Sequence, residues 1–216
     1  QTSSLGEGRT AIAISVGGWH TCAILDNGEV SCWGYNGYEQ LGDQSSETQY
    51  APVMASFSSH NLSAVVISTG NYHTCAILND KSSFCWGDNT DGQLGNAGYD
   101  AVNLSTTMPI NFELGRTAVS ISSGGMHTCA ILDDESTVCW GDNSEGQLGD
   151  GTNTDRNTPT QIGNLGINRT AIAVSAAGWD KFTCSILDDE TFSCWGYNVN
   201  GQLGDGTAIS RNFPKV

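Results

Sequence analysis

The feature that most constrains the fold of this chain is an internal repeat of about 54 residues. Each repeat contains a cysteine that opens a short apolar run, a Cys-Trp-Gly triplet ten residues later, and a Gln-Leu-Gly triplet six residues beyond that glycine. The first cysteines of successive repeats are 53, 54 and 55 residues apart. Repeats of this size are typical of propellers and solenoids, in which each repeat is one supersecondary unit. The cysteines are Cys22 and Cys32, Cys75 and Cys85, Cys129 and Cys139, and Cys184 and Cys194.

The repeats fill the chain and leave no domain boundary inside it. The 216 residues equal four periods of 54. If the carboxyl end were joined to the amino end, the linker between the last repeat and the first would have about the length of the linkers inside the chain. We therefore expect the segment after Pro214 to be followed in space by a segment equivalent to residues 1–15, from the same longer chain or from another copy. The repeats are assigned to residues 10–63, 64–116, 117–169 and 170–216, the last completed by a segment equivalent to residues 1–9.

One repeat is predicted to contain four short strands. Residues 11–15 and 20–25 are apolar and partly β-branched, and a Gly-Gly pair separates them. Residues 29–33 follow a turn signal at 26–28, and Pro52 is expected to begin the fourth strand, where its missing N–H costs least. No segment shows a sustained apolar period of 3.6 residues, so helices are not expected. Short strands with Gly-rich turns predict a propeller blade.

The loop at residues 26–28 fixes the register of the second and third strands. A three-residue loop places Leu25 opposite Glu29, so that Cys22 faces Cys32 across the hairpin. Such a loop requires a left-handed residue at its third position, which is Gly28 in the first repeat. The other repeats carry a side chain there, so we expect some backbone strain. These residues are Lys81, Glu135 and Glu190.

The repeat pattern is Gly-x-His-Thr-Cys-Ala-Ile-Leu followed by Cys-Trp-Gly-x-Asn-x-x-Gly-Gln-Leu-Gly. It closely resembles the repeats of the regulator of chromosome condensation family over essentially the whole chain. The resemblance implies an all-β fold of propeller-type blades, each a four-stranded antiparallel sheet, within a larger ring or a continuous array. The cysteine pairs resemble the secreted, disulfide-containing branch of the family. The chain departs from the pattern at Glu39, which replaces a glycine, at Phe182, which replaces the histidine, and in having four repeats rather than the usual seven.

The cysteine pairs admit two chemistries, disulfide formation and zinc binding. His20, Cys22 and Cys32 would lie close enough together to ligate zinc, and His73 and His127 repeat the arrangement. The fourth repeat loses the histidine but keeps both cysteines, and a spacing of ten lacks the Cys-x-x-Cys pattern of zinc knuckles. These features favour a disulfide within each repeat over a metal site. Four disulfides indicate an oxidising compartment, so the sequence predicts an extracellular or cell-surface protein.

Other repeated residues are interpreted as structural. The histidines lack a distinctive Ser or Asp partner, which favours a ring hydrogen-bonded to backbone inside each blade over a general base. Segments 88–92 and 142–146 resemble the start of a calcium loop without its closing glutamate, which favours turns over calcium sites. The Cys-Trp-Gly tryptophans are expected in the core, whereas Trp19 and Trp179 are expected at the surface or between blades, with a ligand role as the alternative. Five arginines at repeat positions are expected to tie loops together: Arg9, Arg116, Arg156, Arg169 and Arg211.

Composition and charge exclude several classes of protein. The apolar content of 38% is sufficient for a packed core, and no apolar run approaches the roughly 18 to 20 residues of a membrane-spanning helix. Acidic residues outnumber basic ones 23 to 8, and the net charge is −15. Because such a surface repels phosphate groups, we expect neither a nucleic-acid partner nor membrane insertion.

Three Asn-x-Ser/Thr sequons begin at Asn61, Asn103 and Asn168. Their number is what chance predicts in a chain rich in Asn, Ser and Thr. Their positions between repeats are compatible with surface glycans, so the sequence allows a glycoprotein without requiring one.

No residue set is interpreted as catalytic, so the sequence predicts neither an enzyme nor a cofactor. Two hypotheses remain for its function. The first is a secreted structural repeat protein that assembles into an extracellular filament or surface layer, with other copies or further repeats of the same chain as partners. The second is a closed secreted β-propeller that binds another extracellular protein in adhesion or inhibition. The whole number of repeats favours the first, because exposed strand edges at the ends of an array need covering.

Overall fold

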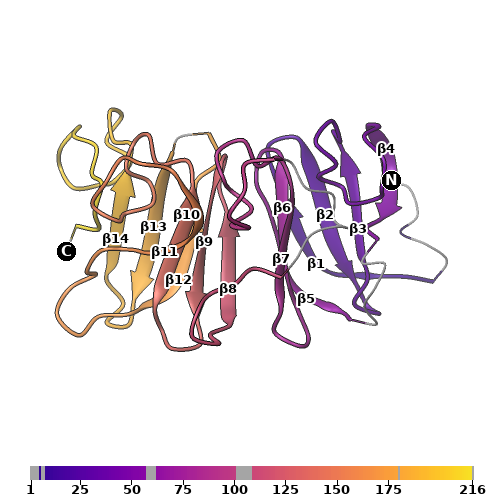
Figure 1. Cartoon of the computed structure of the whole chain (residues 1–216), viewed down its shortest axis with the longest axis horizontal. Helices are drawn as coiled ribbons and strands as arrows, with labels where there is room; N and C mark the ends of the chain where they lie inside the picture. The colour runs from indigo at the N-terminus through magenta and orange to yellow at the C-terminus, as the bar shows by residue number, and fades with distance from the viewer. Residues whose placement is uncertain (1–4, 6–7, 57–61, 101–108, 180, 216) are drawn as a thin grey trace.

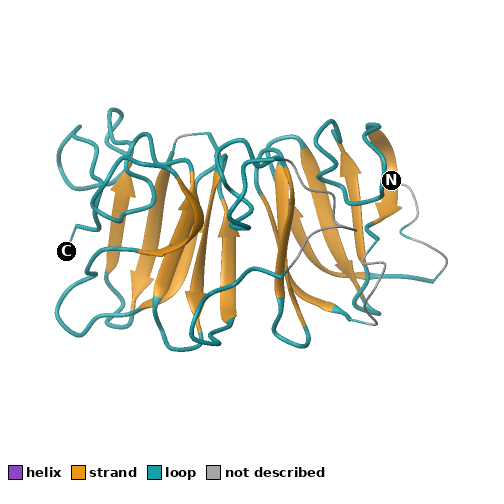
Figure 2. Ribbon diagram, in the orientation of Figure 1, coloured by secondary structure: helices purple, strands orange, loops and turns teal. Residues whose placement is uncertain are grey.

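The computed structural model describes residues 5, 8–56, 62–100, 109–179 and 181–215, and within these the regular structure is entirely β-strand (Figure 2). Each repeat starts with three strands joined as an antiparallel meander. The strands are β1 (Ala11–Val16), β2 (His20–Leu25), β3 (Val30–Gly34), β4 (Gln49–Met54), β5 (Ala64–Thr69), β6 (His73–Leu78), β7 (Ser83–Gly87), β8 (Ala118–Ser123), β9 (His127–Leu132), β10 (Thr137–Gly141), β11 (Arg156–Gln161), β12 (Ala171–Ala176), β13 (Phe182–Leu187) and β14 (Phe192–Gly196).

Each repeat forms one antiparallel sheet, as the sequence predicts. Among the described residues, the first and third sheets have four strands, in the orders β1-β2-β3-β4 and β8-β9-β10-β11, and the second and fourth have three, β5-β6-β7 and β12-β13-β14. In the fourth sheet, a bridge joins Gly196 to Arg211 and the Ser193 hydroxyl donates to the Lys215 carbonyl at 2.8 Å, so residues 211–215 follow the path of a fourth strand. In the second sheet, the amide of Ile110 donates to the Ser83 carbonyl at 2.8 Å.

The hairpin register predicted from the loop length is confirmed. Cys22 pairs with Cys32 across β2 and β3, and the corresponding cysteines pair in the other three sheets. The structure contains four disulfides, each within one repeat and each joining Cα atoms 4.1 Å apart. The third loop residue is left-handed in every repeat: φ is 81° at Gly28, 72° at Lys81, 68° at Glu135 and 67° at Glu190.

The predicted start of the fourth strand is wrong. Strand β4 begins at Gln49, and Pro52 lies in its middle, as Pro159 does in β11. Both strands are the last in their sheets, so the missing N–H faces outward and breaks no ladder hydrogen bond. A shift in the pairing of β3 with β4 between Cys32 and Gly34 accommodates the residues that precede the proline.

The sheets pack face to face as successive blades, with the two chain ends at opposite ends of the array (Figure 1). The first strands β1, β5, β8 and β12 lie side by side along one edge. Between each pair of blades lies a separate apolar cluster, to which the earlier blade contributes its disulfide and the later blade its Cys-Trp-Gly tryptophan. Trp86, Trp140 and Trp195 are fully buried in these clusters, as the sequence predicts for the repeated tryptophans.

The loop after the third strand is built by its own Asn and Gln side chains. In the third repeat, Asn143 Oδ1 accepts from the Leu148 amide at 3.0 Å, and Gln147 Oε1 accepts from the Glu145 amide at 2.9 Å. In the second repeat, the Asp88 carboxylate accepts hydrogen bonds from Thr90 and Gln93 at 3.0 to 3.2 Å. The two segments that resemble a calcium loop therefore use their polar atoms to close turns.

Candidate binding surfaces

A polar relay crosses every boundary between blades. At the boundary of the second and third blades, the main-chain carbonyl of Gln93 accepts hydrogen bonds from Trp140 Nε1 at 2.8 Å and from the Thr128 hydroxyl at 2.9 Å. His73 Nε2 lies 2.9 Å from the same hydroxyl. The two other boundaries repeat these contacts with Gln40, Trp86, Thr74 and His20, and with Gln147, Trp195, Thr183 and His127.

The histidines are neutral members of this relay. Because the threonine hydroxyl gives its one hydrogen to the glutamine carbonyl, the imidazole donates from Nε2 and carries no proton on Nδ1. Burial lowers the pKa of His20 and His127 to about 4 and of His73 to about 3. The expected bond from the ring to backbone inside its own blade is therefore wrong, because Nε2 bonds a hydroxyl of the next blade.

The far side of the fourth blade exposes the surface that the other blades bury. We call this surface the carboxyl-terminal end face, defined by Ile186, Phe192, Gly204 and the disulfide of the fourth repeat. Ile186 is 48% exposed and Phe192 is 65% exposed, whereas the equivalents of Ile186 in the other blades are at most 4% exposed. A shallow apolar hollow of about 370 Å³ on this face is lined in part by the two cysteines of the disulfide. No described atom lies within 4 Å of a Cβ built on Gly204. A Cβ built on Gly95 would collide with Trp140 of the following blade, and one built on Gly149 would collide with Trp195.

The face of the first blade that points away from the second blade exposes the groups that the later blades bury against their preceding neighbour. We call this surface the amino-terminal end face, defined by Ile14, Val16, Thr21 and Trp33. Ile14 is 64% exposed and Val16 is 71% exposed, whereas Ile121 and Ser123 at the same positions of the third blade are buried. Thr21 and Trp33 are partly exposed, although the equivalent threonines and tryptophans of the later blades are fully buried.

Five aromatic side chains gather where the first strand of each blade turns into the second. This aromatic cluster consists of Trp19, Tyr35, Tyr38, Tyr72 and Trp179. Trp19 stacks on Tyr72 with ring centroids 6.3 Å apart, and meets the edge of Trp179, which belongs to the fourth repeat, also at 6.3 Å. Tyr72 lies 6.0 Å from Tyr35 and 5.2 Å from Tyr38. The sequence singled out Trp19 and Trp179 as surface residues but missed Tyr38, which only the tertiary structure places beside them.

Glycines allow the turns of successive blades to meet beside this cluster. The amide of Gly18 donates to the Gly70 carbonyl at 3.2 Å, and the amide of Gly125 donates to the Ala177 carbonyl at 3.0 Å. A Cβ on Gly17 would lie 2.1 Å from the Gly70 oxygen, so this turn accepts no other residue without moving. The turns of all four blades surround a hollow of about 390 Å³, with Trp179 at its rim.

All five arginines pair with aspartates in nearby loops or turns, as expected. Arg156 contacts Asp150 at 2.7 Å and Arg211 contacts Asp205 at 2.9 Å, each within one long loop. The other three arginines each precede a repeat and reach the hairpin turn of the repeat that follows, with nitrogen-to-oxygen distances of 3.0 to 3.6 Å. These pairs are Arg9 with Asp26, Arg116 with Asp134, and Arg169 with Asp188 and Asp189.

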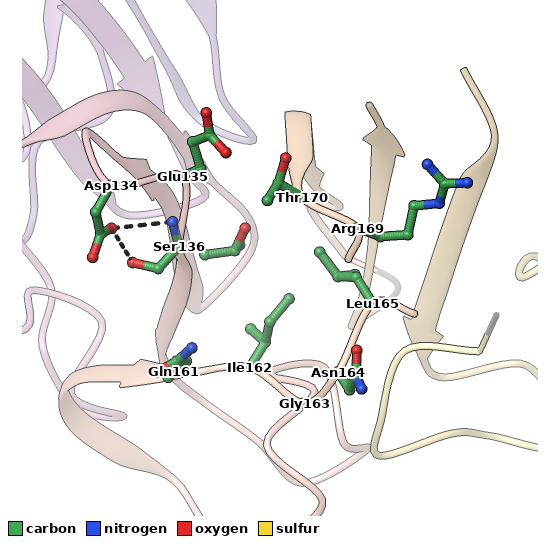
Figure 3. A pocket seen from close by; sticks show the side chains of 11 residues that line it. Asp134, Glu135, Ser136, Gln161, Ile162, Gly163, Asn164, Leu165, Arg169 and Thr170 are labelled. Carbon is green, nitrogen blue, oxygen red and sulfur yellow. Dashed lines mark hydrogen bonds between the residues drawn. The ribbon is translucent and has the colours of Figure 1, made fainter. Parts of the chain in front are cut away.

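A polar groove of about 420 Å³ lies at the hairpin end of the third and fourth repeats (Figure 3). Two of its three charged side chains have partners: Asp134 accepts from Ser136 at 2.5 Å, and Arg169 contacts Asp189 at 3.0 Å. We assign no ligand to this groove.

The part of the chain that the structure describes contains no helix with the length and apolar character needed to cross a membrane.

Of the three sequons, only Asn168 lies among the described residues, where it is exposed with a φ of 56°. Asn61 and Asn103 lie outside the described residues. Glycosylation at these asparagines stays a prediction.

Antiparallel sheets packed face to face, with their first strands along one edge, define a β-propeller-type blade array. The chain belongs to the family of the Regulator of chromosome condensation (RCC1) repeat, which matches residues 27–77, 82–131 and 139–184, and a second description of the same repeat matches residues 11–40, 64–93 and 118–147.

Relatives of this chain include much longer proteins. It is 29% identical over 212 residues to the Ultraviolet-B receptor UVR8 of Arabidopsis thaliana, covering 97% of this chain and 46% of that protein. It is 27% identical over 210 residues to the human E3 ubiquitin-protein ligase HERC2, covering 97% of this chain and 4% of that protein. The chain thus spans less than half the length of either relative.

Solved structures confirm the fold. Human WBSCR16 matches with a TM-score of 0.82 at 19% identity, over 95% of this chain and 52% of that one. Yeast RCC1 (Prp20), in its complex with Kap60, matches with a TM-score of 0.75 at 23% identity, over 97% of this chain and 50% of that one. The RCC1-type repeats are consistent with a protein-binding module, and the four disulfides are consistent with an extracellular location.

Proposed function

We propose that this chain is a secreted, non-catalytic structural protein whose blades continue head to tail into an extracellular filament or surface layer. The observation that carries the proposal is the complementarity of its two end faces. The carboxyl-terminal end face has the Gln202 carbonyl at the repeat position of the Gln40, Gln93 and Gln147 carbonyls, and a disulfide whose Cys184 is partly exposed. The amino-terminal end face offers Trp33 Nε1 and the Thr21 hydroxyl, the donors that meet this carbonyl at every internal boundary.

We expect the occupant of each end face to be the opposite face of another copy or a further repeat of the same longer chain. The residues needed on both sides are already in this sequence, and burying Ile186, Phe192 and Trp33 supplies the apolar area that drives association. A head-to-tail contact of this kind builds a filament when its rotation does not close and a ring when it does. Phe182, which replaces the histidine of the relay, would make this junction more apolar than the internal ones.

The test is the assembly state of the 216-residue chain, with its disulfides intact, in sedimentation and electron microscopy. We expect concentration-dependent oligomers with a four-blade repeat. Ile186→Asp should weaken assembly at least about tenfold, because it places a charge in an apolar contact. Ile167→Asp changes an isoleucine that is 88% exposed outside both end faces, and should leave assembly unchanged. A chain that stays monomeric at every concentration, or assembles equally well with Ile186→Asp, contradicts the proposal.

The aromatic cluster favours a second candidate, a secreted propeller module that binds another extracellular protein in adhesion or inhibition. Exposed tryptophan and tyrosine rings are enriched at protein interfaces. Closed, compact rings of four blades in the same micrographs would favour this candidate over the filament.

A further inference from the structure

The fold does not require the rings of the aromatic cluster. The position of Trp19 carries Tyr72 in the second repeat and Met126 in the third, and the position of Tyr35 carries aspartate in both of these repeats. By contrast, the tryptophans of the blade interior recur in every repeat. Since four copies of one blade form with different residues at these positions, the aromatic rings serve something other than blade formation.

The rings are exposed rather than packed into a core. Trp19 is 51% exposed, Trp179 is 63% exposed, and Tyr35 and Tyr38 are each more than a third exposed. They come from the first, second and fourth repeats and form one continuous group through the contacts of Trp19 and Tyr72. A contiguous aromatic surface of this kind is characteristic of a binding site, because each ring gains free energy when a partner covers it.

One carboxylate of the second blade acts on the cluster. The charge of Asp88 is the main cause that raises the pKa of Tyr38. Asp88 is itself buried and accepts hydrogen bonds from Thr90 and Gln93, so it contributes negative potential rather than an exposed partner for an ion pair.

Exposed aromatic faces on an acidic protein provide two attractions for the same kind of group. A guanidinium or ammonium ion is attracted to the face of a tryptophan or tyrosine ring. The net charge of −15 adds a long-range field that attracts cations and repels anions. A neutral or acidic partner would lack the attraction to the net negative charge and the attraction of a cation to the ring faces.

We propose that the aromatic cluster is a docking site for an arginine- or lysine-rich segment of a partner protein, with its cationic side chains on the exposed rings of Trp19 and Trp179. This site lies on the loops rather than on the end faces, so it remains available whether or not the chain assembles.

The test uses a labelled peptide of alternating arginine and glycine, with a matched peptide in which neutral citrulline replaces arginine. Binding to the disulfide-intact chain is followed by fluorescence anisotropy at physiological salt. We expect the arginine peptide to bind at least about tenfold more tightly than the citrulline peptide. Trp19→Ala should weaken arginine-peptide binding about fivefold or more, and Trp19→Phe should restore part of it.

Tyr50→Ala is the matched control, because Tyr50 is 95% exposed on β4 and lies outside the cluster. It should bind the arginine peptide like the unaltered chain. Equal binding of the two peptides, equal loss in Tyr50→Ala and Trp19→Ala, or no binding up to about 1 mM peptide would overturn the proposal. Binding that Trp19→Ala leaves unchanged and that disappears with added salt would identify attraction by net charge alone, and would overturn it as well.

Discussion

The buried histidines show how one residue type is used the same way at three blade boundaries. Each imidazole donates to a threonine of the next blade, and that threonine donates to a glutamine carbonyl. The ring must be neutral to fit, since a proton on Nδ1 would place a charge in a buried, apolar setting. This accounts for the lowered pKa of His20, His73 and His127.

We expect these histidines to make the fold sensitive to mild acid. Their pKa in the folded state lies well below the value of about 6.5 in the unfolded chain, so the unfolded chain binds more protons between about pH 4 and 6.5. Stability is therefore complete above about pH 6.5 and falls as the pH is lowered, by roughly 1 kcal/mol per histidine for each pH unit. Urea unfolding measured between about pH 5 and 7, above the range where most carboxylates titrate, checks this.

His73→Phe provides the comparison, because Phe182 already occupies the equivalent position in the fourth repeat. This variant should lose about a third of the pH dependence, since it removes one of three such histidines. An unchanged slope in His73→Phe would show that other groups cause the acid sensitivity.

At the scale of the element, the second hairpin of each blade has one backbone shape with different residues at its left-handed position. Lys81, Glu135 and Glu190 adopt the same conformation as Gly28. Gly28 differs in its surroundings, because a Cβ built there would lie 2.3 Å from the Cβ of Ser63. The first hairpin thus depends on glycine for close packing against Ser63, at the end of the same repeat, as well as for its backbone conformation.

We expect Gly28→Ala to lower the free energy of unfolding by about 1 to 2 kcal/mol from backbone conformation alone, and further through the contact with Ser63. Glu135→Ala should change it little, because that loop already holds a side chain. Adding Ser63→Gly to Gly28→Ala should recover the steric part, which denaturant unfolding can measure. Equal losses for Gly28→Ala and Glu135→Ala would contradict both the backbone cost at Gly28 and the cost of the clash with Ser63.

Across the whole molecule, stability depends on contacts between neighbouring blades. Each of the three apolar clusters is shared by two consecutive blades. The second and third blades are covered on both faces, whereas the first and fourth are covered on one. In an array of this kind, stability is close to a sum over the blades and their interfaces, so the end blades open more readily.

We expect native-state hydrogen exchange to be faster in β13 than in β9, although the two strands occupy the same position in their repeats. Ile186 of β13 is 48% exposed, whereas Ile131 of β9 is 4% exposed. In dilute solution, the amides of β13 should therefore have the lower protection. On head-to-tail assembly, the difference should largely disappear, because the end face becomes covered. Equal protection of the two strands in a demonstrated monomer would contradict the exposure of this face.

The local structure of each blade could be predicted from the sequence. The loop length between the second and third strands determines which residues face each other, so the cysteine pairing and the left-handed positions follow from residues close together in the chain. The start of β4 could not be predicted in this way. That strand follows a long loop, and its pairing with β3 decides where it begins.

Only the tertiary structure decided what lies between blades and on their surfaces. The threonine that each histidine contacts is 54 to 56 residues away, and the aromatic cluster joins residues of the first and fourth repeats. No local pattern encodes these contacts, because they depend on the rotation of one packed sheet against the next. The sequence by itself determined four similar blades, and their packing determined which copies of the same side chain are buried and which remain exposed for a partner.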